Sequence, residues 1–236
     1  MKIMAFDSTA KAASVAVTDN EQLLALYTVD NGLTQSELLL PMAESILSSL
    51  HLTFDDIELF SCCVGPGSFT GVRIGASLVK GLAFGKGIPC VPVSTVEALA
   101  YNLAGLEGII VPCMDARRSQ VYTAIFEAKN GVLKRITNDE ALPLTELAEK
   151  LSVYENKNIY VCGDGYGVAT SKLAELGVKL ADTPYLLRNE NAYSCAAVAY
   201  KSYLNGEYTD DSGIAPTYLR LPQAERERIE KLKSIT

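Results

Sequence analysis

A glycine-rich turn is the part of this sequence best suited to bring the backbone close to another group. It follows an apolar run at 59–64 and consists of Gly65, Pro66, Gly67, Ser68, Phe69, Thr70 and Gly71. Glycine adopts conformations closed to other residues and proline fixes one backbone angle, so the chain can turn tightly from a strand into a helix. Its N–H groups could hold a phosphate, or the turn could pack against a neighbouring element. Both alternatives are open from the sequence.

Hydrolytic and metal chemistry have few candidate residues. The single histidine, His51, cannot form a two-histidine metal site and leaves no paired base for a nucleophile. Ser68 lies in a G-P-G-S-F context without a G-x-S-x-G elbow, so we expect it to serve the turn or cap a helix. Six cysteines without a C-x-x-C pair indicate reduced core residues of a cytosolic protein. We therefore predict no catalytic residue and no metal ligand.

Two aspartates end apolar runs at matching places in the two halves of the chain. Asp7 follows Met4-Ala5-Phe6, and Asp115 follows Pro112-Cys113-Met114. Eight residues beyond each aspartate lies a second apolar run, at 15–17 and at 123–125, and a polar turn and a third run follow. The repeated strand–Asp–hairpin unit indicates an internal duplication.

Charge and composition narrow the class of protein. The chain has 236 residues, 48% of them hydrophobic, enough for one large domain or two small ones. A net charge of -7 makes tight, unaided binding to RNA or DNA unexpected. The sequence has no uninterrupted apolar run long enough for a membrane span, so we expect a cytoplasmic protein that is neither secreted nor inserted in a membrane.

Hydrophobic periodicity predicts alternating strands and helices and hence parallel sheet segments flanked by helices. The expected strands are 2–7, 12–18, 22–29, 59–64, 88–93 and 158–163, and the expected helices are 37–50, 70–85, 96–103, 144–151, 166–176 and 192–204. We expect a first lobe at 1–105, a second at 106–222 and a charged tail at 223–236. The helix at 192–204 is expected to pack back on the first lobe.

The helices at 37–50 and 70–85 have unusual surfaces. Gly75 and Gly81 within the second helix cost roughly 2 kcal/mol relative to alanine, so another backbone should approach this helix closely. In the first helix Leu38, Leu39 and Leu40 spread apolar surface over most of the circumference. Such a helix needs a third layer or a partner.

Three motifs carry a resemblance to a known family. Phe6-Asp7-Ser8-Thr9, the G-P-G-S-F-T-G-V-R-I-G string at 65–75 and Pro216-x-Tyr218-Leu219-Arg220 resemble the TsaB family, also called YeaZ. The resemblance covers about 1–221 and is densest in the first 105 residues. It implies a duplicated, ribonuclease H-like α/β fold with two βββαβα-type lobes, as in the actin, sugar-kinase and Hsp70 (ASKHA) superfamily.

The resemblance also bears on catalysis and cofactors. In the catalytic paralogue TsaD, a histidine pair in a V-N-H-x-E-G-H stretch binds a metal, and the corresponding stretch at 93–99 has Thr95 and Leu99 at those positions. The superfamily's phosphate hairpin is rich in glycine, whereas the hairpin after Asp7 has none. We therefore expect neither metal nor ATP on this chain, both residing on partner subunits. The weak candidates for residual nucleotide binding are Asp7, Asp115, Gly163 and Gly165.

The implied function is that of a non-catalytic subunit of the bacterial complex that transfers threonylcarbamoyl to adenosine 37 of ANN-decoding tRNAs (t6A). The implied partners are a TsaD-like paralogue, a TsaE-like ATPase reached through the heterodimer, and a second copy when alone, with tRNA contacted only indirectly. The expected interface is Leu39, Met42, Ala43, Ile46, Val72, Arg73, Ala76, Val79 and Lys80. Two alternatives stay open: burial of these faces inside the lobe, and an active ASKHA-type ATPase or phosphotransferase.

Overall fold

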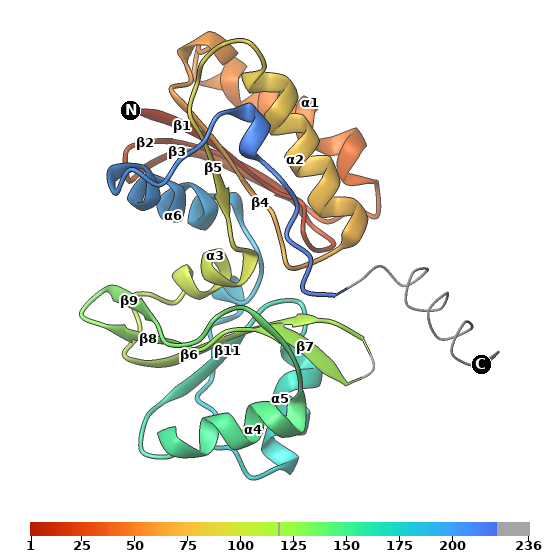
Figure 1. Cartoon of the computed structure of the whole chain (residues 1–236), viewed down its shortest axis with the longest axis vertical. Helices are drawn as coiled ribbons and strands as arrows, with labels where there is room; N and C mark the ends of the chain where they lie inside the picture. The colour runs from red at the N-terminus through yellow and green to blue at the C-terminus, as the bar shows by residue number, and fades with distance from the viewer. Residues whose placement is uncertain (118, 221–236) are drawn as a thin grey trace, which may run out of the picture.

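The computed structural model describes residues 1–117 and 119–220, and Figure 1 shows two lobes stacked along the long axis. The first lobe is built on a five-stranded sheet with the order β3-β2-β1-β4-β5. Antiparallel pairs join the first three strands, and β4 and β5 run parallel to β1. The strands are β1 (Lys2–Asp7), β2 (Ala13–Asp19), β3 (Gln22–Val29), β4 (Leu59–Cys63) and β5 (Cys90–Val93).

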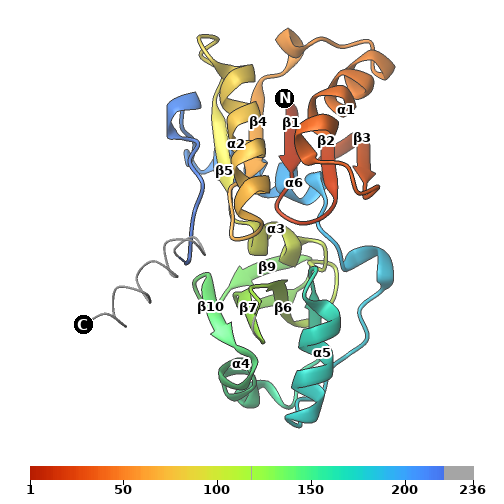
Figure 2. The same cartoon turned by 90° about the vertical axis from the view of Figure 1, so that its right-hand side faces the viewer.

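Alternating side chains of this sheet build two separate cores. One face, with Met4 and Phe6, packs against α1 (Gln35–Ser49) and α2 (Phe69–Ala83). The other face, with Ile3 and Ala5, packs against α6 (Ala192–Leu204). Because successive residues of a strand point to opposite faces, a nearly all-apolar β1 serves both layers. Helix α6 therefore packs on the first sheet, although it follows the second lobe in sequence (Figures 1 and 2).

The second lobe contains a sheet with the order β10-β7-β6-β8-β9, and β11 pairs in parallel with β6. Helices α4 and α5 pack together and against this sheet. The elements are β6 (Gly108–Asp115), β7 (Gln120–Thr123), β8 (Phe126–Lys129), β9 (Val132–Arg135), β10 (Glu140–Pro143), β11 (Ile159–Cys162), α4 (Leu144–Leu151) and α5 (Tyr166–Glu175). Short 3-10 turns occur at Phe54–Asp56, Ser152–Tyr154, Tyr185–Leu187 and Asp211–Gly213.

Helix α3 (Thr95–Tyr101) joins the two lobes. Its side chains Val96 and Leu99 share a core with Ile110 and Phe126 of the second lobe. The same helix contacts α6, so it lies between the layers of both lobes in Figure 1. The lobes are thus joined by packed apolar side chains as well as by the chain itself.

The duplicated hairpin unit is confirmed. Asp7 pairs with Ser14 in the β1–β2 hairpin, and Asp115 pairs with Val121 in the β6–β7 hairpin. The second unit differs from the expected pattern because the return strand is broken at 124–125, where the Ile125 N–H donates to the Thr137 hydroxyl at 2.9 Å. The expected helices and strands are otherwise present, with ends displaced by a few residues, while β10 was not predicted.

The six cysteines are confirmed as core residues. All are buried and none forms a disulfide. Burial raises the pKa of the Cys90 thiol to about 11 and that of Cys113 to about 12, so both are protonated, unreactive thiols at neutral pH. Among the described residues, no helix is long and apolar enough to cross a membrane.

Candidate functional site

The glycine-rich turn packs against the chain itself. A Cβ at Gly65 would lie 2.5 Å from the Thr217 carbonyl oxygen, and one at Gly67 would lie 2.6 Å from the Thr9 carbonyl oxygen. At Gly71 the added carbon would overlap the carbonyl oxygen of Ser8. Three glycines therefore admit two neighbouring backbone segments, one from the loop after β1 and one from the C-terminal part of the chain. The structure shows the packing alternative for this turn.

Two backbone N–H groups of this turn make hydrogen bonds within the chain. The Ser68 N–H donates to the Thr9 carbonyl at 2.7 Å, and the Gly71 N–H donates to Ser68 Oγ at 3.2 Å. Ser68 is thus the N-cap of α2, as the sequence indicated. The Ser8 hydroxyl donates to the Gly71 carbonyl at 2.8 Å and closes the loop from the other side. A phosphate would have to displace these bonds.

Asp7 is sealed beneath this contact. Its Oδ1 accepts hydrogen bonds from the Thr9 N–H at 2.9 Å and the Thr9 hydroxyl at 2.6 Å. Its Oδ2 is buried without a partner among the described residues, and burial raises the pKa of this carboxyl. Ser8 and Thr9 are each 1% exposed, so their side chains fill the space beside the strand end.

Asp115, the equivalent residue of the second lobe, lies in a more open place. Its side chain is 38% exposed and accepts the Arg117 N–H at 2.7 Å. Its own N–H donates to Asp164 Oδ1 at 2.9 Å, which joins the end of β6 to the loop after β11. Desolvation by burial raises the pKa of Asp164, with the Asp115 charge contributing in the same direction.

The glycines of the loop after β11 serve close backbone packing. Gly163 has φ 99°, and a Cβ there would overlap the Cys113 carbonyl oxygen. A Cβ at Gly165 would lie 2.8 Å from the same oxygen, which accepts the Gly165 N–H at 2.9 Å. Gly163 and Gly165, two of the candidates for residual nucleotide binding, therefore allow this loop to pack against β6.

Glu190 is a further member of this region that the sequence did not reveal. It precedes α6, is 5% exposed, and its Oε1 accepts the Asp164 N–H at 3.3 Å. Burial raises the pKa of Glu190 to about 8, helped by the charges of Asp164 and Asp7. Glu190 is therefore near enough to Asp164 and Asp7 to interact with their charges, and it is protonated and uncharged at neutral pH. Within the described residues, no group of three or more acidic, histidine or cysteine side chains is arranged to hold a metal ion.

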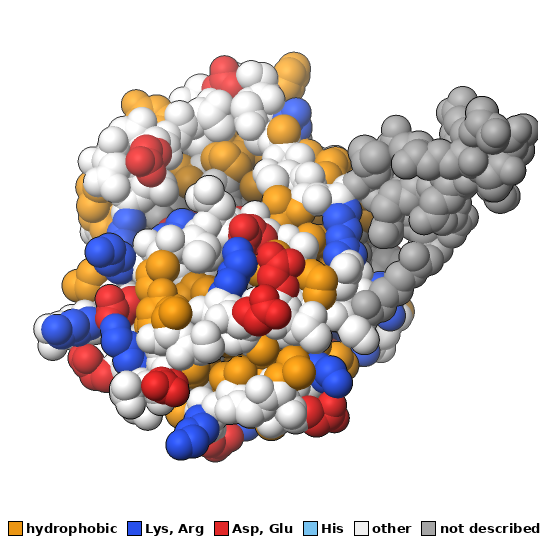
Figure 3. Space-filling model, turned by 60° about the horizontal axis from the view of Figure 1, so that its bottom comes forward, with side chains coloured by type: hydrophobic (Ala, Val, Ile, Leu, Met, Phe, Trp, Pro, Cys, Tyr) orange, Lys and Arg blue, Asp and Glu red, His pale blue; other side chains and the backbone are white. Residues whose placement is uncertain are grey.

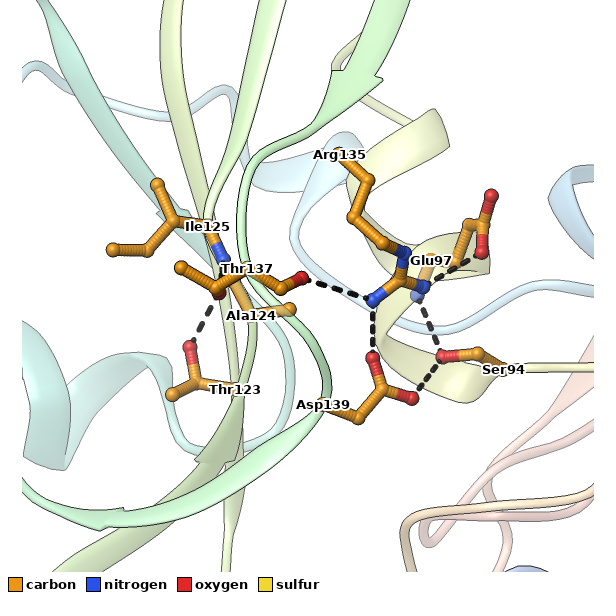
Figure 4. A network of polar contacts seen from close by, with 8 residues as sticks. All are labelled: Ser94, Glu97, Thr123, Ala124, Ile125, Arg135, Thr137 and Asp139. Atoms are coloured by element: carbon orange, nitrogen blue, oxygen red, sulfur yellow. Dashed lines mark hydrogen bonds and ion pairs between the residues drawn. The ribbon is translucent and has the colours of Figure 1, made fainter.

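Residues 93–99, which correspond to the metal-binding stretch of TsaD, include side chains that pack against the second lobe. Thr95 is fully buried with its hydroxyl unpartnered, and Leu99 lies in the core shared by α3 and the second lobe. Glu97 Oε2 accepts from Arg135 Nη2 at 2.6 Å, and the same guanidinium binds Asp139 (Figure 4). Ser94 caps α3 and donates to Asp139 Oδ2 at 2.6 Å. Glu97 therefore connects α3 to the second sheet through its ion pair with Arg135 of β9.

The predicted interface residues fall on the inner side of α1 and α2. Two of the nine, Arg73 and Lys80, are accessible to solvent. The other seven are buried, and all of them except Val72 belong to the core between the helices and the sheet: Leu39, Met42, Ala43, Ile46, Val72, Ala76 and Val79. The most apolar positions of an amphipathic helix face the core, so in the chain alone these side chains serve packing. The alternative of burial inside the lobe describes these seven.

An apolar groove runs along the outer side of the same helices. Its cavity measures about 430 Å³ and is lined by Ser36, Leu39, Leu40, Phe69, Thr70, Arg73, Ile74, Ser77 and Leu78. Leu40 is 38% exposed and Phe69 is 37% exposed, so the groove presents large apolar side chains to solvent. We call this feature the α1/α2 groove. Helix α1, one wall of this groove, begins with a capping box in which the Thr34 N–H donates to Glu37 Oε2 at 3.0 Å.

One end of the α1/α2 groove is closed by an aromatic cluster. Arg73 Nε donates to the Tyr218 hydroxyl at 2.7 Å, and its guanidinium carbon lies 3.8 Å from the Phe69 ring centroid. The Phe69 and Tyr218 rings are 5.0 Å apart. Two residues later, Arg220 donates to the Ala116 carbonyl of the second lobe at 3.0 Å. Tyr218 and Arg220, which belong to a quoted sequence motif, thus connect α2 with the end of β6.

Charge on the second lobe is mixed. Figure 3 shows basic and acidic side chains next to one another on this face, interspersed with apolar ones. Several are paired, as in Lys157 with Glu127 at 2.5 Å and Lys150 with Glu140 at 2.7 Å. Such pairing weakens the field that a polyanion would feel.

The fold and its strand-end carboxylates define the class: this is an actin-like α/β protein in which each lobe begins with the same strand–Asp–hairpin unit. The model of one protein family, described as "TsaD: tRNA N6-adenosine threonylcarbamoyltransferase", matches residues 34–227. A protein of Bacillus subtilis named "tRNA threonylcarbamoyladenosine biosynthesis protein TsaB" is 31% identical over 99% of this chain and 100% of its own length. The chain belongs to the TsaB family, within the wider group that includes TsaD.

Two further relatives agree with this membership. The TsaB protein of Escherichia coli is 28% identical over 93% of this chain and 95% of its own length. The structure described as "YeaZ from Pseudomonas aeruginosa" is similar with a TM-score of 0.75 and 23% identity, covering 92% of this chain and 99% of that one. This structural likeness confirms the predicted fold.

Proposed function

We propose that this chain is a non-catalytic subunit of the t6A-forming machinery that acts by pairing with a TsaD-like protein. The observation that carries the proposal is that residues 93–99, which correspond to the metal-binding stretch of TsaD, have no side chains suited to hold a metal at its two histidine positions. Leucine at position 99 offers no ligand and lies in the core shared with the second lobe, and the side chain of Thr95 is fully buried. Relatives named for t6A biosynthesis span nearly the whole chain, which supports the same process.

The strand end of the first lobe gives independent support for a role without nucleotide chemistry. The phosphate-side hairpin is filled by the buried side chains of Ser8 and Thr9, and the N–H groups of Ser68 and Gly71 at the start of α2 make hydrogen bonds within the chain. We therefore assign ATP and metal to partner subunits and treat tRNA contact as indirect. A cytoplasmic location, where tRNA is modified, follows from this proposal.

The α1/α2 groove is the surface we assign to the TsaD-like partner. It presents exposed leucine, phenylalanine and arginine side chains, and aromatic residues and arginine are enriched where binding energy concentrates. This assignment keeps the helix pair of the first lobe, residues 1–105, as the interface but replaces the buried side chains with exposed neighbours. A TsaE-like ATPase would then be reached through the heterodimer, and self-association would use the same groove.

Reconstitution of t6A synthesis tests the proposal. Purified TsaD-like and accessory proteins are assayed with tRNA, with and without this chain, and with the variant Leu40→Glu/Leu78→Glu. We expect modification to require the chain, and the variant to lose both association and activity because two carboxylates enter an apolar groove. Val153→Glu is the matched control, since Val153 is 76% exposed in the second lobe and far from the helices.

Two results would contradict the proposal. One is full t6A synthesis without the chain or with the double variant correctly folded. The other is brisk, magnesium-dependent ATP hydrolysis by the pure chain, which would favour the ATPase or phosphotransferase alternative.

A further inference from the structure

The α1/α2 groove lies beside the point where the described chain ends. Tyr218 contacts both Phe69 and Arg73, and these two residues line the groove. Arg220 follows two residues later and is held by the Ala116 carbonyl. The remaining segment, 221–236, lies outside the described residues and follows Arg220 directly, two residues after the aromatic contact with Phe69 and Arg73.

We propose that segment 221–236 binds in the α1/α2 groove of its own chain and thereby competes with any protein that uses this surface. The proposal concerns the same surface as the proposed function, but it is tested on the chain alone. Its occupant is this named segment, and a second copy or a TsaD-like partner are competing occupants.

The length of the segment fits the groove. Sixteen residues follow Arg220, and a helix of that length would extend about 24 Å at ~1.5 Å per residue. Helix α2, which forms one wall, has 15 residues and so extends about 22 Å. Pro222 disfavours helix at the residue before it, so the chain is suited to turn immediately after the aromatic cluster.

The chemistry of the segment also matches. Ile229, Leu232 and Ile235 recur every three residues, the spacing of one helix face, and the groove offers Leu40, Ile74 and Leu78. Helix α1 carries Glu37 and Glu44 but no lysine or arginine. The segment has four basic side chains, Arg226, Arg228, Lys231 and Lys233, and three acidic ones, Glu225, Glu227 and Glu230, while α2 adds Arg73 and Lys80 to the other wall. Because both signs of charge occur on the segment and on the helices, it is the apolar contacts that favour this pairing.

Disulfide trapping in the full-length chain tests the proposal directly. The native cysteines are buried, so Leu40→Cys/Leu232→Cys places the reactive thiols where the segment should meet the groove. The matched control is Val132→Cys/Leu232→Cys, because Val132 is 64% exposed on β9, and Figure 1 shows β9 on the side of the second lobe opposite the end of the described chain. Under mild oxidation we expect the first pair to close within one chain at least ~10-fold faster than the control.

Equal closure of the two pairs, or disulfides formed only between two chains, would overturn the proposal. The second result would identify another copy as the occupant. A second variant, Ile229→Asp/Leu232→Asp, should raise amide hydrogen exchange at exposed positions of α2, and unchanged exchange would also count against the proposal. Neither measurement involves a partner, so loss of t6A activity in the groove variant and failure of trapping are separable outcomes.

Discussion

The ends of β1 and β6 are equivalent positions of a duplicated unit, yet they are built in opposite ways. Asp7 is 2% exposed and sealed by Ser8, Thr9 and the turn that starts α2. Asp115 is partly exposed and accepts a single local N–H. The strand end of the first lobe is therefore a packing site, whereas the strand end of the second lobe is open to solvent.

The largest expected effect comes from breaking the seal of the first lobe. Gly71→Ala places a carbon on the Ser8 carbonyl, so we expect the free energy of unfolding to fall by about 2–4 kcal/mol. Chemical denaturation, followed by far-ultraviolet circular dichroism of the helices, measures this free energy of unfolding.

Gly81→Ala is the matched control in the same helix. Nothing lies within 4 Å of a Cβ at Gly81, so alanine should raise the free energy of unfolding by about 0.5–1 kcal/mol. If both variants changed stability alike, the seal would not be a packing contact.

The next effect concerns Glu190, which is buried near Asp7 of the first strand end and Asp164 of the loop after β11. Its folded pKa, about 8, exceeds the ordinary value of 4.5, so the folded state holds a proton that the unfolded state has released. The free energy of unfolding should therefore decline as pH rises from 4.5 to 8, by at most about 1.4 kcal/mol per pH unit. Above pH 8 it should level off.

Glu190→Gln removes this cost and should stabilise the protein by roughly 1–3 kcal/mol near pH 9, with little change at pH 4.5. Thermal unfolding followed across this pH range measures the difference. Glu155→Gln, on the exposed surface, should leave the profile unaltered. A Glu190→Gln profile parallel to that of the parent protein would show that Glu190 is already ionised.

A smaller effect is expected at the attractive contact between α3 and the second lobe. Arg135 binds Glu97 and Asp139 while only 29% exposed, so Arg135→Gln leaves two carboxylates without their cation. We expect a loss of about 1–2 kcal/mol and faster proteolysis around 136–140. The exposed pair Lys172–Glu175 provides the contrast, because Lys172→Gln should cost less than about 0.5 kcal/mol.

The smallest effect is expected at the open strand end. Asp115→Asn keeps an acceptor for the Arg117 N–H and removes a partly exposed charge, so stability should change by less than about 0.5 kcal/mol. Should this variant destabilise strongly, the second strand end would be as tightly built as the first, and the comparison would fail.

The sequence predicted the repeated hairpins and most element positions because those rest on local alternation and turn residues. Strand β10 was missed because it is four residues long and contains Pro143, which is uncommon in strands. The broken return strand depends on Thr137, twelve residues from the Ile125 N–H that it accepts. Contacts of that range leave no local pattern.

The site was harder to predict than the fold. Glycine at 65, 67 and 71 indicated close approach, but only the structure shows that Ser8, Thr9 and Thr217 are what approach. Hydrophobicity selected residues of α1 and α2 that are mostly buried, since the strongest apolar positions serve the core, and the interface on these helices stays a prediction. Glu190 belongs to no motif and gains its raised pKa from residues distant in the sequence.

The placement of α6 has a consequence for synthesis on the ribosome. One face of the first sheet is covered by α6, through residues such as Ala196 and Ala199. These residues are translated only after the entire second lobe. The interposed lobe is contiguous and can fold first, while the earliest strands stay half covered. Chains arrested near residue 190 should therefore yield a protease-resistant fragment from the later-made lobe, and resistance of the earlier-made one instead would refute this order.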